Sequence, residues 1–347
     1  MTLPQLRVDL DVLAANLGVV RARISPAELM LVVKDDAYGH GLAPVVRRAV
    51  AEGVRWFGAF DVSEAVRTRE AAGAAARIFS WLTVGADEIA AALAADVELG
   101  VGDAEFLEDI AAVVRSGAAP ARVHLKIDTG LHRNGIRPEE WAAVIERARV
   151  LADAGLVRVV GVWSHIAEAS DAEDDAARRI FDDAVTAAED AGLALEVRHL
   201  SASAASFDRP EFRYDLARVG AFCYGIRSAG GVGEADLGVD PAASLVAPVT
   251  HVARHEVTLG IGALHGVPST LARRTALVID GRRVAVRDVG LTHLRVEAWP
   301  DAAVGDEVCV FGPNAASATD LAETIDSVGE EILVRVSPLV PRIYREA

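Results

Sequence analysis

Two lysines are the most distinctive chemical feature of this chain. Of its 35 lysines and arginines, 33 are arginine, so that Lys34 and Lys126 are the only lysines. Either residue can serve as a surface cation, but only lysine can lose its proton near neutral pH and act as a nucleophile or form an imine. Lysine at just these two positions indicates amine chemistry. The alternative is that two lysines are retained here by chance.

Three further polar side chains stand at the ends of short apolar runs. His165 comes after VRVVGVWS, Ser203 after LEVRHLSA, and Arg218 stands within DLARVGAF. Taken singly, such a histidine is often a hydrogen-bonded core residue, and such an arginine often forms a structural ion pair. Both lysines also end apolar runs. If these runs are strands of one barrel, all five side chains meet at its carboxyl-terminal face, where barrel enzymes hold their active sites.

The first two thirds of the chain alternates β-branched runs with Ala-, Glu- and Arg-rich stretches of helical spacing, which is typical of βα units on a parallel sheet. We predict strands at 29–33, 55–60, 77–82, 97–101, 122–127, 157–162, 195–200 and 217–224. We predict helices at 62–72, 87–94, 104–116, 138–155 and 172–192. This alternation predicts an α/β fold with an N-terminal TIM (β/α)8 barrel.

The residue composition and the hydrophobic pattern of the sequence change after Gly230. The remaining chain is rich in Gly and Val and is interrupted by turn residues, and Asp280-Gly281 joins two β-like runs in the manner of a hairpin. This part predicts a smaller, mostly β C-terminal domain. We place the barrel domain at 1–228 and the β domain at 229–347.

Charge and composition exclude several classes of partner. The formal net charge of −16 would repel nucleic acid and anionic membranes. The longest apolar runs, such as 29–33, are too short to cross a bilayer, and residues 1–20 lack the pattern of a targeting segment. Cys223 and Cys309, the only cysteines, offer neither a disulfide framework nor a zinc cluster. We therefore expect a cytoplasmic protein without a bound metal.

Several motifs resemble the alanine racemase family. VVKDDAYGHG is similar to the family's attachment motif for pyridoxal 5′-phosphate (PLP), and KIDTGLHRNG to its second signature. HLSASAA and RVGAFCYG resemble later motifs of the barrel. GVPSTLARRTALVIDGRRVAV, GDEVCVFG and VPRIY resemble segments of the C-terminal domain. The motifs occur in family order from RVDLDVLAANL onward, so that the resemblance covers essentially the whole chain and implies a homodimer acting on a small amino acid.

The resemblance also implies which residues hold the cofactor. Lys34 would bind PLP covalently, and Tyr38 and Ser203 would hold its phosphate. Backbone N–H groups at Gly220 and Ala221 would also contact the phosphate, with Tyr224 closing this region. His165 would pack against the pyridine ring. Arg218 would donate to the ring nitrogen, and because arginine keeps its proton, the ring would stay largely unprotonated.

Two residues of the second signature are implied to serve the substrate. The arginine that corresponds to Arg133 lies beside the substrate carboxylate in this family, oriented by a carbamate on the lysine that corresponds to Lys126. A buried ion pair with Asp128 is the alternative for Lys126. We favour carbamylation, because an anion beside an arginine gains charge complementarity.

The chain departs from the family at the second catalytic base. Alanine racemases use the attachment lysine on one face of the substrate and a tyrosine from the partner subunit on the other. The segment between THVARHE and VTLGIG is too short for the hairpin that carries this tyrosine, and a forced alignment puts Leu259 in its place. The only tyrosines are Tyr38, Tyr214, Tyr224 and Tyr344. We therefore interpret the chain as a divergent member that lacks the tyrosine.

Other substrate-side motifs also differ. The G-Y-A-D-G gate motif is replaced by 262–266, which contains His265, and an M-D pair is replaced by Leu291 and Thr292. Asp36 replaces an asparagine of the attachment motif. His265 or His165 is a candidate substitute base, and a loop histidine exposed to solvent is the alternative for His265. These changes leave the substrate open.

Three functions follow from these sequence observations. The first is an amino-acid racemase with weak or altered racemisation. The second is a PLP enzyme with Lys34 as its only base, which performs transamination, elimination or proton exchange on one face. The third is a PLP-binding protein with little turnover.

Overall fold

The computed structural model describes residues 3–168 and 170–346, which divide into two compact units. The barrel unit lies within 20–34 and 49–220, and the sheet unit within 3–19, 35–48 and 221–346. The chain passes between the units within helices α1 (Leu10–Ile24), α2 (Lys34–Tyr38) and α3 (Leu42–Ala51), and again after Gly220.

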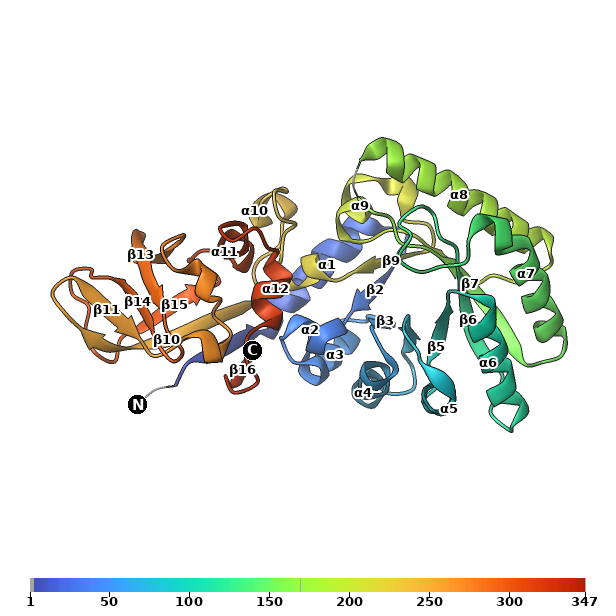
Figure 1. Cartoon of the computed structure of the whole chain (residues 1–347), viewed down its shortest axis with the longest axis horizontal. Helices are drawn as coiled ribbons and strands as arrows, with labels where there is room; N and C mark the ends of the chain where they lie inside the picture. The colour runs from blue at the N-terminus through green and yellow to red at the C-terminus, as the bar shows by residue number, and fades with distance from the viewer. Residues whose placement is uncertain (1–2, 169, 347) are drawn as a thin grey trace. The chain divides into compact units, whose positions relative to one another are not determined.

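Eight parallel strands form the sheet of the barrel unit (Figure 1). Their order is β8 (Val197–His199), β7 (Val157–Trp163), β6 (Ala121–Lys126), β5 (Glu98–Val101), β4 (Arg77–Ser80), β3 (Trp56–Ala59), β2 (Glu28–Val32) and β9 (Leu216–Val219). At the two ends of this order, the backbone N–H of Asp215 donates to the carbonyl of Arg198 (3.2 Å), and that of Arg198 donates to Oδ2 of Asp215 (2.8 Å). This link nearly closes the sheet, and the predicted barrel is confirmed.

Helices lie on the outside of this sheet (Figure 1) and occur where the sequence predicts them. They are α4 (Val62–Ala72), α5 (Gly85–Ala94), α6 (Ala104–Arg115), α7 (Pro138–Asp153) and α8 (Asp171–Asp190). Three of them start where a side chain of Asp61, Asp103 or Ser170 accepts a hydrogen bond from the backbone N–H three residues later. Two shorter elements, α9 (Ser203–Asp208) and η1 (Pro210–Phe212), follow β8.

The predicted strand at 217–224 is too long. β9 ends at Val219, and Ala221–Tyr224 form a 3-10 helix, η2. The AFCY segment is buried throughout. A short buried apolar run has the same appearance in a strand and in a helical turn, so that its composition could not separate the two.

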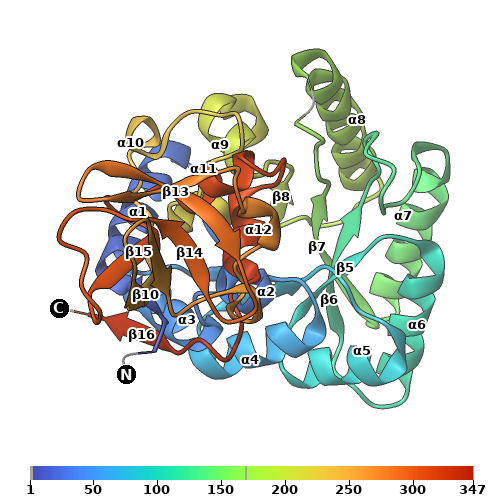
Figure 2. The same cartoon turned by 60° about the vertical axis from the view of Figure 1, so that its left-hand side comes forward.

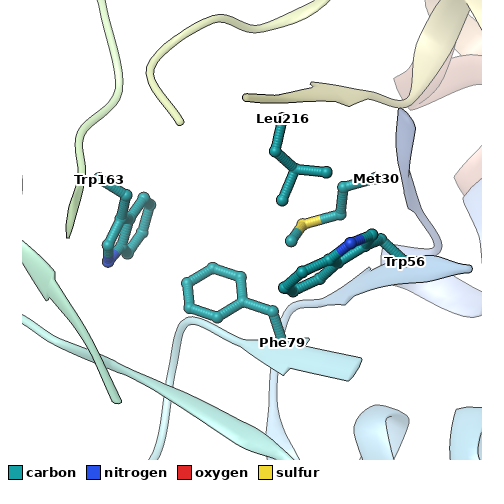
Figure 3. Close-up of a cluster of buried hydrophobic side chains, with 5 residues drawn as sticks. All are labelled: Met30, Trp56, Phe79, Trp163 and Leu216. Atoms are coloured by element: carbon teal, nitrogen blue, oxygen red, sulfur yellow. The ribbon is translucent and has the colours of Figure 1, made fainter. Parts of the chain in front are cut away.

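Five strands contribute an apolar cluster to the barrel interior. Figure 3 shows Met30, Trp56, Phe79, Trp163 and Leu216 turned toward one another, and each of these side chains is buried. The rings of Phe79 and Trp163 meet edge to face, with centroids 5.1 Å apart. Such aromatic pairs add about 0.5–1.5 kcal/mol beyond the area that they bury. The interior is therefore a packed core, and polar groups within it need partners.

The sheet unit is mostly β (Figure 2). Its strands run in the order β12 (Ala276–Ile279), β13 (Arg282–Val289), β14 (Leu294–Glu297), β11 (Glu256–Leu259), β10 (Ala243–Val252), β1 (Gln5–Asp9) and β16 (Arg342–Arg345), and β15 (Glu307–Phe311) pairs with β10. Its short helices are α10 (Glu234–Leu237), α11 (Ala318–Glu323), α12 (Gly329–Val334), η3 (Ala263–His265) and η4 (Ser269–Leu271). The predicted mostly β C-terminal region is confirmed.

The predicted hairpin at Asp280-Gly281 joins β12 to β13. Ile279 faces Arg282 across it, and both turn residues have positive φ, 49° for Asp280 and 76° for Gly281. A two-residue turn with two positive φ values matches the right-handed twist of the strands that it connects.

Within the described residues, no helix combines the length and the apolar character that crossing a bilayer requires. The same residues contain no group of three or more His, Cys, Asp and Glu side chains that could hold a metal ion.

Candidate active site

The barrel unit places most of the sequence-predicted polar residues at or just beyond the carboxyl ends of its strands. Lys34 follows β2, Lys126 ends β6, and His165 lies two residues after β7. Ser203 begins α9 after β8, and Arg218 lies within β9. Parallel strands bring these ends to one face of the barrel.

The lowered pKa of His165 reflects burial and the positive charges near its ring. Its pKa is lowered to about 3, first by burial and then by the positive charges of Arg218, Arg133, Lys126 and Lys34. At neutral pH the ring is therefore uncharged, and four cations act on it. Such a concentration of positive charge suits a ligand with anionic groups.

Arg218 donates hydrogen bonds to several neighbours, but not all of its N–H groups are used. It is 6% exposed, and its Nη2 donates to the carbonyls of Ser164 (2.7 Å) and Leu200 (3.0 Å), with Nδ1 of His165 at 3.3 Å. Its Nη1 donates to Nδ1 of His199 (3.0 Å). In the part of the chain that the structure describes, its Nε–H and one Nη1–H have no hydrogen-bond partner. Burial, followed by the charge of Arg133, lowers the pKa of Arg218 to about 9, so that the guanidinium remains charged at neutral pH.

Lys126 lies in a polar and aromatic niche. Its Nζ donates to Oδ1 of Asn134 (3.2 Å) and sits 4.5 Å from the ring centroid of Trp163. Burial, followed by the charges of Arg218 and Arg133, lowers its pKa to about 8. Asp128 instead accepts hydrogen bonds from Gly130 and His132. The ion pair between Lys126 and Asp128 is thus not found within the described residues.

Arg133 and Ser203 occupy two other parts of the barrel unit. Arg133 is exposed and lines a hollow of about 440 Å³ together with Asp128, His132, Asn134, Gly135, Arg137, Pro138 and Glu139. Ser203 Oγ accepts a hydrogen bond from the backbone N–H of Gly220 (3.4 Å). The backbone N–H of Gly220 is therefore a donor of the kind that holds anions at backbone sites.

The segment after Lys34 forms one turn of left-handed helix. Asp35, Asp36, Ala37 and Tyr38 have φ of 56°, 56°, 56° and 52°. Each such residue costs about 1–2 kcal/mol, and conformations of this kind gather at functional sites. Oδ1 of Asp36 accepts the backbone N–H of Leu42 (3.0 Å) at the start of α3. The unusual carboxylate of the attachment motif therefore supports this turn.

Tyr38 and Tyr224 lie together in the sheet unit. Their ring centroids are 5.0 Å apart, and His40 packs 4.8 Å from the ring of Tyr224. Nδ1 of His40 donates to the carbonyls of Ala37 and Tyr38, both at 3.0 Å, whereas its buried Nε2 has no hydrogen-bond partner among the described residues. Ala221 begins η2, which also carries Tyr224. Sequence reasoning missed His40, although its place between two glycines of the attachment motif was a signal.

The hairpin between β10 and β11 is short. Only residues 253–255 separate the two strands, and the backbone N–H of Ala253 donates to the carbonyl of Glu256 (2.8 Å). Leu259 is fully buried and pairs with Val249 and Leu294. It is therefore a core residue of this sheet.

His265 lies in η3, where its Nδ1 accepts the backbone N–H of Gly262 (3.1 Å). This bond leaves the Nε2 of a neutral ring as the nitrogen that carries the proton. Close by, the backbone N–H of Leu264 donates to the carbonyl of Leu291 (2.9 Å), and these two leucines are 56% and 67% exposed. The altered gate and the altered M-D pair are thus joined by a backbone hydrogen bond, and each exposes a leucine side chain.

Two family models match most of the chain. Residues 8–228 match the alanine racemase N-terminal domain, and residues 248–344 match the alanine racemase C-terminal domain. The chain belongs to the alanine racemase family. Among its relatives, the alanine racemase of Beutenbergia cavernae is 36% identical, with 97% of this chain and 96% of that protein aligned. That of Thermobifida fusca is 33% identical, with 98% of both chains aligned.

Solved alanine racemases have the same fold. The enzyme from Streptomyces coelicolor A3(2) superposes with a TM-score of 0.94 at 31% identity, over 99% of this chain and 98% of that one. The enzyme from Streptomyces lavendulae, a D-cycloserine producer, gives a TM-score of 0.93 at 31% identity, over 100% and 98%. The two-part architecture is thus that of alanine racemases.

Proposed function

We propose that this chain binds PLP covalently through Lys34 and uses it to exchange the α-proton of a small amino acid. The observation that carries this proposal is the buried guanidinium of Arg218, which keeps two N–H groups without a hydrogen-bond partner among the described residues. Such donors fit an acceptor nitrogen in a flat ring. The four cations around His165 fit the phosphate of PLP and the carboxylate of a substrate.

Each remaining residue has a role in this proposal. The phosphate is held by the side chains and backbone groups of Tyr38, Ser203, Gly220, Ala221 and Tyr224. His165, which is uncharged, packs against the ring, and Arg133 binds the substrate carboxylate. When bound, PLP supplies an electron-accepting ring that makes the α-proton of an attached amino acid more acidic. Lys34 then moves that proton on one face. We keep the division at 228/229 as the boundary between the cofactor domain and the β domain.

The opposite face lacks a tyrosine, and the tight turn at 253–255 supports this part of the proposal. We propose that His265, or else water, supplies the proton there. A one-base enzyme is therefore the second candidate function, favoured by the same turn, and a non-catalytic PLP-binding protein is the third.

Solvent deuterium incorporation at the α-carbon tests this proposal. The purified protein is incubated in D2O with each enantiomer of alanine, serine and other small amino acids, and incorporation and optical inversion are followed separately. Exchange with inversion from both enantiomers supports a racemase. Exchange of one enantiomer without inversion supports the one-base enzyme. Absence of exchange with all of them would reject turnover and leave the binding protein.

We expect Lys126 to carry a carbamate. Its lowered pKa raises the fraction of neutral amine, which is the form that reacts with CO2, and an anion there would offset part of the cationic cluster. Carbamate formation should therefore rise with pH through about 8. With ¹³C-bicarbonate, a carbamate signal should appear in the wild type and be absent from Lys126→Arg, which keeps the charge. Its persistence in that variant would assign it to another amine.

We also expect a homodimer in which the β domain of each subunit covers the barrel of the other. Two reasons support this expectation. His265, with its proposed role, lies in the sheet unit, and a reactive site needs a cover that excludes water. Light scattering at micromolar concentration should give twice the mass of the chain. A monomer at that concentration would remove this arrangement.

A further inference from the structure

Four buried polar side chains form a line through the interior of the barrel unit, each from a different strand. Glu98 belongs to β5, His124 to β6, His199 to β8 and Arg218 to β9. The first three are 0% exposed and Arg218 is 6% exposed. Oε2 of Glu98 lies 2.8 Å from Nε2 of His124, whose Nδ1 lies 3.0 Å from Nε2 of His199. Nδ1 of His199 lies 3.0 Å from Nη1 of Arg218.

Chemistry at the two ends fixes the direction of every hydrogen bond in this line. A guanidinium can only donate, so that Nδ1 of His199 must accept and its Nε2 must carry the proton. Nδ1 of His124 must then accept, and its Nε2–H donates to Glu98. An ionised carboxylate can only accept, which demands the same direction. Both rings are therefore neutral and protonated on Nε2.

The ionised state of Glu98 has its own support. Arg77 donates to both carboxylate oxygens of Glu98, at 2.6 and 2.8 Å, and the guanidinium of Arg122 lies 3.2 Å away. Burial alone would raise the pKa of Glu98, but the hydrogen bonds from His124 and Arg77 outweigh it and lower the pKa to about 2. The line thus begins at a fixed negative charge.

Aromatic neighbours hold the two rings in place. His199 stacks on Trp163 with an interplanar angle of 7°. The ring of Phe79 is tilted against that of His124 (centroids 4.7 Å apart) and perpendicular to that of His199 (5.3 Å). An imidazole left without hydrogen-bond partners in such a core would destabilise the fold. An ion pair of Glu98 with Arg77 would need neither histidine. In the line, by contrast, both ring nitrogens of each histidine have a hydrogen-bond partner.

We propose that Glu98 is a positioning residue for the cofactor-binding arginine. Acting through His124 and His199, its carboxylate fixes the hydrogen bonding of Arg218, so that the two remaining N–H groups stay available to the bound ring. Chains of hydrogen bonds polarise one another, which lets a charge at one end affect the donor at the other. This inference rests on the proposed function, because Arg218 matters here as a PLP contact.

Glu98→Gln and Glu196→Gln make a matched pair for the test. Glu196 also binds Arg77 (2.6 Å) but makes no hydrogen bond or ion pair with the histidines in the described structure, so that its substitution removes a charge from the same arginine and spares the line. Both are made in the Lys34→Ala background, where PLP should bind only reversibly. We expect Glu98→Gln to raise the Kd for PLP by about tenfold, as outer partners of ligating groups typically contribute. Glu196→Gln should change it by less than about twofold, since exposed ion pairs contribute little.

A second readout does not depend on the cofactor. In protein labelled with ¹⁵N-histidine, assigned by His124→Gln and His199→Gln, both ring signals should be those of the neutral Nε2–H tautomer. Glu98→Gln should mix the tautomers of His124, because an amide can donate as well as accept, whereas Glu196→Gln should not.

The outcomes separate the two proposals. A charged ring or an Nδ1–H tautomer in the unaltered chain would overturn the line, even if Glu98→Gln failed to fold. Equal PLP affinity in the two glutamine variants would overturn the positioning role. Failure of PLP to bind in any background would instead reject the proposed function.

Discussion

Lys34→Ala should abolish covalent attachment of PLP and slow α-proton exchange by about 10⁴-fold or more. General base catalysis alone contributes about 10² to 10⁴, and the same amine also forms the covalent bond to the cofactor. No other lysine except Lys126 exists to replace it. Lys34→Arg should be as inactive as Lys34→Ala, because a guanidinium keeps the charge but neither forms an imine nor accepts a proton.

Borohydride reduction followed by peptide mass spectrometry checks this prediction. The reduced cofactor should be found on the peptide that contains VVKDDAYGHG and be missing from both variants. Lys126→Ala is the matched control, since it removes the other lysine and should leave the label on Lys34. Cofactor attached to Lys126, or none after incubation with PLP, would show that the assignment of the attachment site is wrong.

The second large effect concerns the two enantiomers. If no tyrosine serves the opposite face, as proposed, one enantiomer of alanine should exchange its α-proton faster than the other by a factor of about 10² to 10⁴, the range that a positioned acid or base contributes. Racemisation of alanine should be slower than in typical family members by a similar factor. Initial rates of deuterium incorporation from the separate enantiomers give this ratio directly.

His265→Ala and His265→Gln extend the measurement. If His265 is the substitute base, both variants should increase the asymmetry further. His293→Gln is a suitable control, because His293 is another histidine of the same unit and the proposal does not use it. Fast and symmetric racemisation that survives His265→Ala would mean that another residue completes the site.

The repeating architecture was predictable because its signals are local. Helix α4 has the predicted bounds, since Asp61 caps its start and Gly73 with φ of 75° follows its end. Most residues of the barrel strands are buried, so that the strands appear as largely apolar runs between those helices. The end of β9 was not predictable in this way, because the buried AFCY turn that follows it has the composition of a strand.

The site was predictable only in part. The grouping of Lys34, Lys126 and Arg218 on one face could be predicted, because residues near the carboxyl ends of parallel strands lie on the same face of a barrel. The left-handed turn of 35–38 gave no such signal, since Asp35 and Ala37 are not residues that favour positive φ as glycine does. Glu98 was equally hidden. Its partners come from strands that are distant in sequence, and hydrophobic periodicity carries no information about which buried polar groups pair.

The scarcity of lysine has a practical consequence for chemical labelling. Reagents that acylate amines leave guanidinium groups untouched, so that apart from any α-amino group they can modify only Lys34, which is partly buried, and Lys126, which is 6% exposed. On a protein with a lysine-rich surface, the mass added by such a reagent averages over many irrelevant positions. Here, apart from any α-amino group, each added group counts one of the two lysines that the proposal places in the site, so that intact-mass measurement reads out their occupancy without any substitution. The charge of the 33 arginines is preserved throughout the reaction.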